Sequence, residues 1–126
     1  FCDNRALWHA AAAAELLARE HGLDDALILQ AIARHTTGCR GMSRFDECLY
    51  AADFLDPVRY FSEQDDVWPV FRKDFDAGLL LMCRGTIASV IARHRILDQA
   101  SVDYYNELVL RLEVPGRKLV APAIPG

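Results

Sequence analysis

The sequence predicts an all-α fold, a helical bundle of about six helices. Apolar residues recur at helical spacing, short polar residues that can cap helices precede these runs, and no stretch alternates apolar and polar residues in the manner of a strand. A chain of 126 residues is the size of one domain. We expect residues 1–113 to form that domain, and residues 114–126, with three prolines and two glycines, to be an irregular tail.

The first two helices are expected near the N-terminus. Residues 5–21 form the first, with Asp3 or Asn4 as its N-cap, because a short side-chain oxygen can accept hydrogen bonds from the free amides of the first turn. Gly22 supplies the left-handed stop. A second helix follows over residues 24–35, capped by its first residue.

The middle of the chain predicts a loop and two more helices. Residues 36–43 contain glycines and threonines and indicate a loop that ends at Ser43, the N-cap of a third helix that stops before Pro57. A short helix is expected over residues 65–73, where Pro69 would be tolerated only in the first turn.

The last two helices begin at capping residues. Asp74 caps a long helix that runs to residue 94, and Ser101 caps a final helix that runs to residue 112. Gly78 and Gly85 lie seven residues apart, hence on one face of the long helix, where we expect another backbone to approach closely.

Composition limits the function classes. A net charge of −4 and a pI near 5.5 argue against a nucleic-acid-binding domain, and no apolar run approaches the ~18 residues that span a bilayer. The four cysteines contain no C-x-x-C pair, so they suit neither a disulfide framework nor a zinc finger. Unpaired thiols and no visible signal peptide predict a cytoplasmic protein. Because the chain starts at Phe1 rather than Met, we also expect it to be a piece of a longer protein.

Three polar residues occupy the faces predicted to point inward. His9, His35 and Asp53 each lie three, four, seven or eight residues from apolar residues of their own helix. A buried carboxylate is costly unless a cation or several donors compensate it. Two imidazoles and a carboxylate suit iron, manganese or zinc, so the pattern indicates a metal site.

Other interpretations of these residues remain open. An inward histidine can be a hydrogen-bonded core residue, and Asp53 could cap the next segment or pair with Arg34 or Arg59. The loop that carries Thr36, Thr37 and Arg40 could hold phosphate oxygens, although many surface loops have this composition.

Several strings give the sequence a family resemblance. LWHA at residues 7–10, AIARHTTG at 31–38, GMS at 41–43 and AADFLDPVR at 51–59 resemble the YqeK-type HD-domain phosphohydrolases, which are symmetrical diadenosine tetraphosphate hydrolases. The resemblance covers nearly the whole chain and weakens after residue 114. It implies a helical HD fold around a metal centre with one or two ions, iron first and manganese or another divalent ion as alternatives. It also implies cleavage of diadenosine tetraphosphate into two ADP by metal-activated water.

The resemblance assigns roles to individual residues. Asp53 corresponds to a metal ligand of the family, and His9 and His35 to histidines that face the metal or the bound phosphates. The substrate-binding set implied for diadenosine tetraphosphate, ADP or GDP is His9, His35, Thr36, Thr37, Arg40, Arg59, Asp98 and Ser101.

The sequence also departs from the family. The first metal histidine and the His-Asp pair are not in this chain, Cys39-Arg40 stands where Arg-Pro is usual, and Asp56 replaces a Glu. His9, His35 and Asp53 alone would leave a metal under-ligated. A rival hypothesis is therefore a non-catalytic helical nucleotide-binding module, joined to a nicotinate-nucleotide adenylyltransferase domain. A homodimer is compatible with the apolar stripes of the last two helices.

Overall fold

The computed structural model describes residues 5–59 and 63–113 and is helical throughout its regular elements. The elements in chain order are α1 (Arg5–Glu20), α2 (Ala26–Arg34), α3 (Arg44–Phe54), the 3-10 helix η1 (Pro57–Arg59), α4 (Glu63–Lys73), α5 (Phe75–Ala92) and α6 (Gln99–Leu112). The all-α prediction with about six helices is confirmed. The Asp3 or Asn4 cap and the tail lie outside the described residues.

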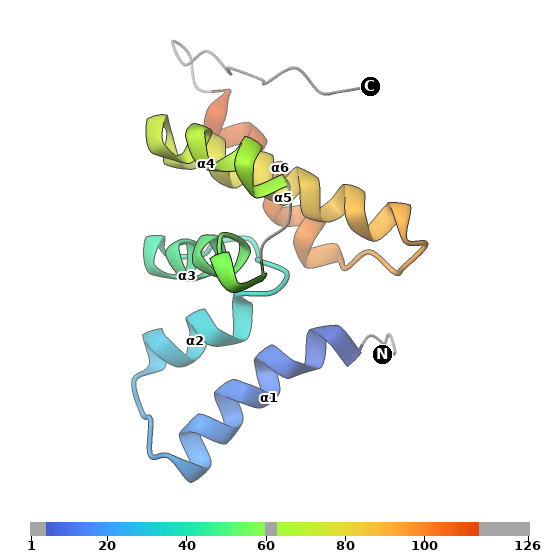
Figure 1. The fold of residues 1–126 in the computed structure, drawn as a ribbon. Coiled ribbons are helices and arrows are strands. Elements are labelled where there is room, and N and C mark those ends of the chain that lie inside the picture. The colour runs from blue at the N-terminus through green and yellow to red at the C-terminus, as the bar shows by residue number, and fades with distance from the viewer. Residues whose placement is uncertain (1–4, 60–62, 114–126) are drawn as a thin grey trace.

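Helices α1, α2 and α3 stack in sequence order, and α4, α5 and α6 group together beyond α3 (Figure 1). Helix α1 packs on α2, α2 on α3, and α3 on α5, which also carries α4 and α6. The core lies where α3, α5 and α6 meet, and its largest fully buried side chains include Leu79, Met82, Tyr104 and Leu108. Helices α1 and α2 therefore form one end of the stack, away from this core.

The helices begin at capping residues as expected, but two of these residues differ from the predicted ones. Ser43 caps α3 as predicted, in a capping box with Asp46, and the Asp74 side chain caps α5. The cap of α2 is Asp25, one residue later than expected. The cap of α6 is Asp98 and not Ser101, because the Asp98 carboxylate already accepts the Ala100 N–H at 2.8 Å and the helix begins there.

Helix α4 contradicts the prediction for Pro69, which lies in the interior of the helix and not in its first turn. Proline has no N–H, so this turn lacks one hydrogen bond of the regular helical pattern. Pro69 is exposed, so its ring meets no buried neighbour and the helix continues.

The two glycines of α5 differ from each other. A Cβ on Gly78 would lie 2.5 Å from the Phe71 ring, so the close neighbour is a side chain of α4 and not the backbone that we expected. A Cβ on Gly85 would meet nothing within 4 Å, so no element approaches there within the described structure. Only Gly78 is required by packing.

Helix α5 is also long and apolar enough, by length and composition, to cross a membrane, which the sequence analysis did not anticipate. Its 18 residues have a mean hydropathy of 1.5. Leu79, Met82 and Cys83 are buried in the core, and the buried Asp76 of its first turn is held in ion pairs. The buried residues make up 28% of the helix, so part of α5 lies in the protein core.

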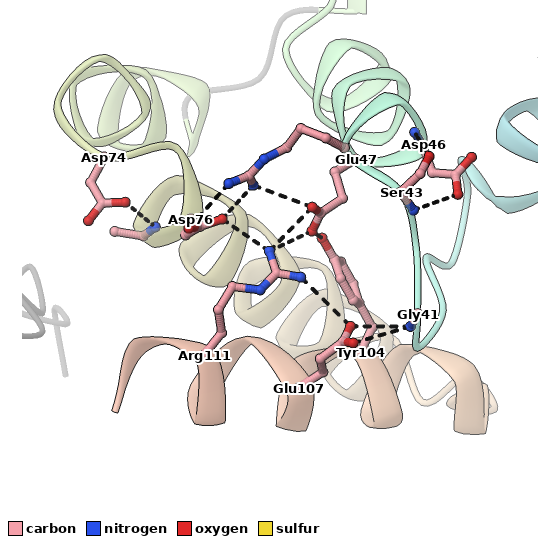
Figure 2. A network of polar contacts seen from close by, with 11 residues as sticks. Gly41, Ser43, Asp46, Glu47, Asp74, Asp76, Tyr104, Glu107 and Arg111 are labelled. Atoms are coloured by element: carbon pink, nitrogen blue, oxygen red, sulfur yellow. Dashed lines mark hydrogen bonds and ion pairs between the residues drawn. The ribbon is translucent and has the colours of Figure 1, made fainter. Parts of the chain in front are cut away.

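A buried carboxylate, Glu47, joins α3 to α6 (Figure 2). It accepts hydrogen bonds from the Tyr104 hydroxyl at 2.6 Å and from Arg111 Nη1 at 2.9 Å, both on α6. Burial, and then the hydrogen bond to Glu47, raise the pKa of Tyr104 well above its usual value. Leaving a buried charge without its partner typically costs about 3–5 kcal/mol, so these contacts fix α6 against α3.

A second buried carboxylate, Asp76 of α5, extends the same network. Arg44 donates to it at 2.5 Å and Arg111 at 3.0 Å. The hydrogen bond from Arg44 is the main cause that lowers the pKa of Asp76 to about 2 from 3.8. Arg111 thus bridges Glu47 and Asp76, and ties α3, α5 and α6 together through one guanidinium.

We expect Gly78→Ala to destabilise the fold by about 1–3 kcal/mol, because the new methyl group enters the Phe71 ring. Gly85→Ala is the matched control on the same helix and should stabilise by about 0.5–1 kcal/mol, because the space is open and alanine favours helix. Urea unfolding of both variants measures the difference. Equal effects of the two substitutions would contradict the packing argument.

We expect the ion pairs of Asp76 to make stability fall in acid. The folded-state pKa is depressed, so the stabilisation is present above pH 3.8 and is lost as the pH falls toward 2. The shift corresponds to about 2 kcal/mol. Urea unfolding at pH 6 and pH 2 should show a smaller loss for Asp76→Asn than for the wild type, whereas Asp66→Asn, an exposed control, should keep the wild-type loss.

Candidate functional site

Two of the predicted site residues, His9 and His35, touch each other. Their ring centroids lie 5.4 Å apart with the planes at 75°, and His9 Nε2 lies 3.2 Å from the Thr36 hydroxyl oxygen. His9 comes from α1, whereas His35 and Thr36 follow directly after α2. The packing of α1 on α2 therefore brings together residues that are 26 and 27 positions apart in the chain.

The orientation of the His35 ring is fixed by its backbone contact. Nδ1 lies 2.5 Å from the carbonyl oxygen of Ile32, which can only accept a hydrogen bond. The proton of the neutral ring is therefore on Nδ1, and the lone pair is on Nε2. This arrangement is typical of histidines that bind a metal or accept a proton.

His35 and Asp53 line one open cavity of about 900 Å³, between α2, α3 and α4. Its other walls are mainly apolar and include Leu49, Leu55, Trp68, Phe71 and Phe75. Asp53 lies in the last turn of α3, so the end of this helix brings a carboxylate to the cavity that the His35 ring also reaches.

The expected inward orientation is wrong for His9, which is exposed, and only partly right for His35 and Asp53, which are half-buried. The spacing correctly grouped His9 with Leu16, but Leu16 is itself 49% exposed. Periodicity identifies a common face, and it does not say whether another element covers that face. The described structure leaves this part of α1 largely uncovered.

A metal site formed by these three residues alone is not present. No group of three or more His, Cys, Asp and Glu side chains with metal-binding geometry occurs among residues 5–59 and 63–113. Imidazole nitrogens and a carboxylate are suitable donors for a divalent ion, but this chain offers them as a partial set.

A second cavity, of about 250 Å³, gathers four of the predicted substrate-binding residues: Thr36, Thr37, Asp98 and Ser101. The Ser101 hydroxyl donates to the Thr37 carbonyl oxygen at 3.0 Å, which joins the start of α6 to the loop after α2. This cavity is therefore built from segments that are more than 60 residues apart in the sequence.

Gly38 sets the path of the threonine loop. Its φ is +66°, and a Cβ there would lie 2.7 Å from the Tyr104 ring. Glycine is required on both counts. The loop thus packs directly on the tyrosine that binds Glu47, so the central polar network also positions Thr36 and Thr37.

Another predicted residue, Arg40, is not brought to these cavities. Arg40 is exposed and lines a separate small cavity with Asp103, Asn106 and Glu107. Arg59 ends η1, and its side chain lies outside what the structure describes. The alternative pairing of Asp53 with Arg34 is not observed, because Arg34 pairs with Asp46 at 3.1 Å.

Sequence reasoning missed the buried carboxylates Asp46, Glu47 and Asp76. The spacing of Ser43 and Asp46 is the capping-box signature and could have indicated the role of Asp46. It also missed Arg93 and Arg95, which line the second cavity. No local pattern marks them, because the cavity also needs the distant residues Thr36 and Ser101.

Comparisons with known proteins agree with the fold and the motifs. Curated relatives named symmetrical bis(5'-nucleosyl)-tetraphosphatase occur in Bacillus subtilis (33% identical over 106 residues) and Halalkalibacterium halodurans (29% over 104 residues). The matches cover 84% and 82% of this chain but 57% and 56% of the relatives. A Staphylococcus aureus protein of the same name is 25% identical over 103 residues. No protein-family profile matches.

A solved structure supports the same relationship. The crystal structure of a predicted HD superfamily hydrolase involved in NAD metabolism, from Clostridium acetobutylicum, superposes with a TM-score of 0.76 at 32% identity. The superposition covers 82% of this chain and 55% of the Clostridium acetobutylicum protein. The chain is therefore similar, over about half of their length, to symmetrical bis(5'-nucleosyl)-tetraphosphatases and to an HD superfamily hydrolase, which confirms the resemblance found in the sequence.

Proposed function

We propose that this chain functions in the hydrolysis of diadenosine tetraphosphate to two ADP, as part of a symmetrical bis(5'-nucleosyl)-tetraphosphatase. The proposal rests on His9, which contacts both His35 and Thr36. His35 lines the first cavity and Thr36 lines the second, so the two cavities adjoin here. A dinucleotide with four phosphates is long and needs two adjoining binding spaces. The relatives of the same name support the choice of substrate, and the chain spans about half of their length.

The residues near the two histidines suit a polyphosphate chain. The His35 ring presents its Nε2 lone pair, which can bind a metal or accept a proton. The hydroxyls of Thr36, Thr37 and Ser101 can donate to phosphate oxygens. Cleavage at the central P–O–P bridge forms one P–O bond from water, breaks the bridging bond and gives two ADP.

A divalent ion would be bound through His9, His35 and Asp53 together with water or further donors, since these three do not form a complete cluster. Iron is the ion that the family resemblance implies, and manganese is an alternative. Such an ion would polarise a phosphate and lower the pKa of a bound water. Asp53 would supply the anionic ligand and would orient toward the ion from the last turn of α3.

The cellular setting follows from the same observations. Cys39, Cys48 and Cys83 are all unpaired, which suits a reducing cytoplasm. Exposed apolar residues such as Ile91 of α5 and Leu110 of α6 leave a homodimer open as a prediction.

A second function is favoured by the partial donor set. With no three-ligand metal cluster among the described residues, the chain could bind nucleotide without hydrolysing it, as a module joined to a nicotinate-nucleotide adenylyltransferase. This candidate predicts ADP binding without metal and without turnover.

We expect incubation of the purified protein with diadenosine tetraphosphate and iron or manganese to yield two ADP, because the cleavage is symmetrical. Chromatography of the products measures this outcome. His35→Gln should abolish turnover, because it removes the Nε2 lone pair. AMP plus ATP as products would show an asymmetric hydrolase, and ADP binding without any product would favour the non-catalytic module.

We expect Asp53→Asn to lower the metal affinity about tenfold or more, because the amide is a neutral ligand. The midpoint of thermal unfolding should change by only a few degrees, since Asp53 is half-buried. Elemental analysis and thermal melts check both values, with the exposed Asp24→Asn as control. Wild-type metal stoichiometry in Asp53→Asn would refute the assignment.

A further inference from the structure

The second cavity is lined by two arginines that have no role in the proposed hydrolysis. Arg93 is the residue that caps the C-terminus of α5, and Arg95 follows two positions later. Both line the cavity formed with Thr36, Thr37 and Ser101. In a protein with a net charge of −4, two guanidiniums beside three hydroxyls form a local site of opposite sign.

The backbone between the two arginines has an uncommon conformation. His94 has a φ of +52°, the left-handed region that non-glycine residues seldom adopt. Its N–H donates to the Ile91 carbonyl oxygen, and the N–H of Arg95 donates to that of Val90. This tight reversal ends α5 and lets residues on both sides of His94 line the same cavity.

The charges of the pair are available for a ligand. Within the described part of the chain, neither Arg93 nor Arg95 forms an ion pair with a carboxylate, whereas Arg34, Arg44 and Arg111 all do. Asp98 is the acidic residue of the cavity wall, and its Oδ1 accepts the Ala100 N–H at 2.8 Å. Its carboxylate is thereby directed to the start of α6.

We infer that Arg93 and Arg95 bind phosphate groups of a nucleoside polyphosphate and make affinity depend on the number of phosphates. Guanidinium groups form charge-assisted, bidentate hydrogen bonds with phosphate oxygens, and the neighbouring hydroxyls complete the shell. Thr36 lines this cavity and also contacts His9, so the cavity of the arginines adjoins the histidine pair through this residue. The inference rests on the proposed function for its substrate class, but concerns binding and not cleavage.

A purely structural role makes a different prediction. Cations at a helix C-terminus stabilise the helix dipole by about 0.3–1 kcal/mol. Such a role would change the melting temperature and would leave nucleotide binding unaltered. A binding affinity that rises with the number of phosphates is therefore expected of the ligand-binding role and not of the structural role.

The experiment compares the affinities of adenosine, ADP and ATP for the full chain by calorimetry, without added metal. The wild type should bind more tightly at each added phosphate, with a strong salt dependence. Arg93→Gln and Arg95→Gln should each weaken ATP binding about tenfold, and the double variant should bind all three ligands alike. Arg95→Lys should retain part of the preference because it keeps the charge.

Arg84→Gln is the matched control, since Arg84 is on α5 but lines neither cavity. It should bind like the wild type. Unchanged ATP preference in the folded double variant overturns the inference, and so does a wild type that binds ATP no better than adenosine. Loss of diadenosine tetraphosphate hydrolysis with an intact arginine-dependent preference would overturn only the proposed function.

Discussion

The buried carboxylate of Glu47 is the interaction on which the arrangement of the helices depends. A charge in the core is tolerated only when donors surround it, and here Arg44 of the same helix is joined by Tyr104 and Arg111 of α6. Arg111 simultaneously binds Asp76 of α5. The three helices must therefore meet in one register, because a shift of any of them would leave a buried charge without its partner. Apolar packing around Leu79 and Leu108 supplies the bulk of the core, but it would tolerate small shifts that this network does not.

The same constraint reaches the candidate site through Tyr104. Its hydroxyl donates a hydrogen bond to Glu47, while its ring packs against Gly38 in the threonine loop. Once α6 is fixed, Ser101 at its start donates to Thr37, and the second cavity closes between the loop and α5. The position of the phosphate-binding candidates is thus a consequence of a polar network whose centre lies elsewhere in the core. A change in the network would be expected to disturb the cavity without touching any residue that lines it.

The histidine pair depends on a different part of the fold. His9 is carried by α1, which packs on α2 at the end of the stack away from the core (Figure 1). The half-buried His35 and Asp53 lie on an open apolar cavity, while His9 is exposed. This side of the molecule offers metal donors without a complete coordination shell. The cavity at the threonine loop is by contrast lined by residues of α5 and α6 as well as the loop, so segments far apart in the sequence define it.

The sequence by itself determined the helical class, most helix ends and the family relationship, because these depend on local rules. Ser43 and Asp74 cap their helices through hydrogen bonds a few residues away, and the motifs around His35 and Asp53 are contiguous strings. Only the tertiary structure decided which polar residues are buried. Periodicity placed His9 on an apolar face, but burial requires a second element to cover that face, and at His9 none of the described elements does so. The burial of Glu47 was not predicted because its partners, 57 and 64 residues away, are not encoded in any local pattern. Arg93 and Arg95 were overlooked for the same reason, since the cavity that they line forms only when α6 returns to the loop after α2.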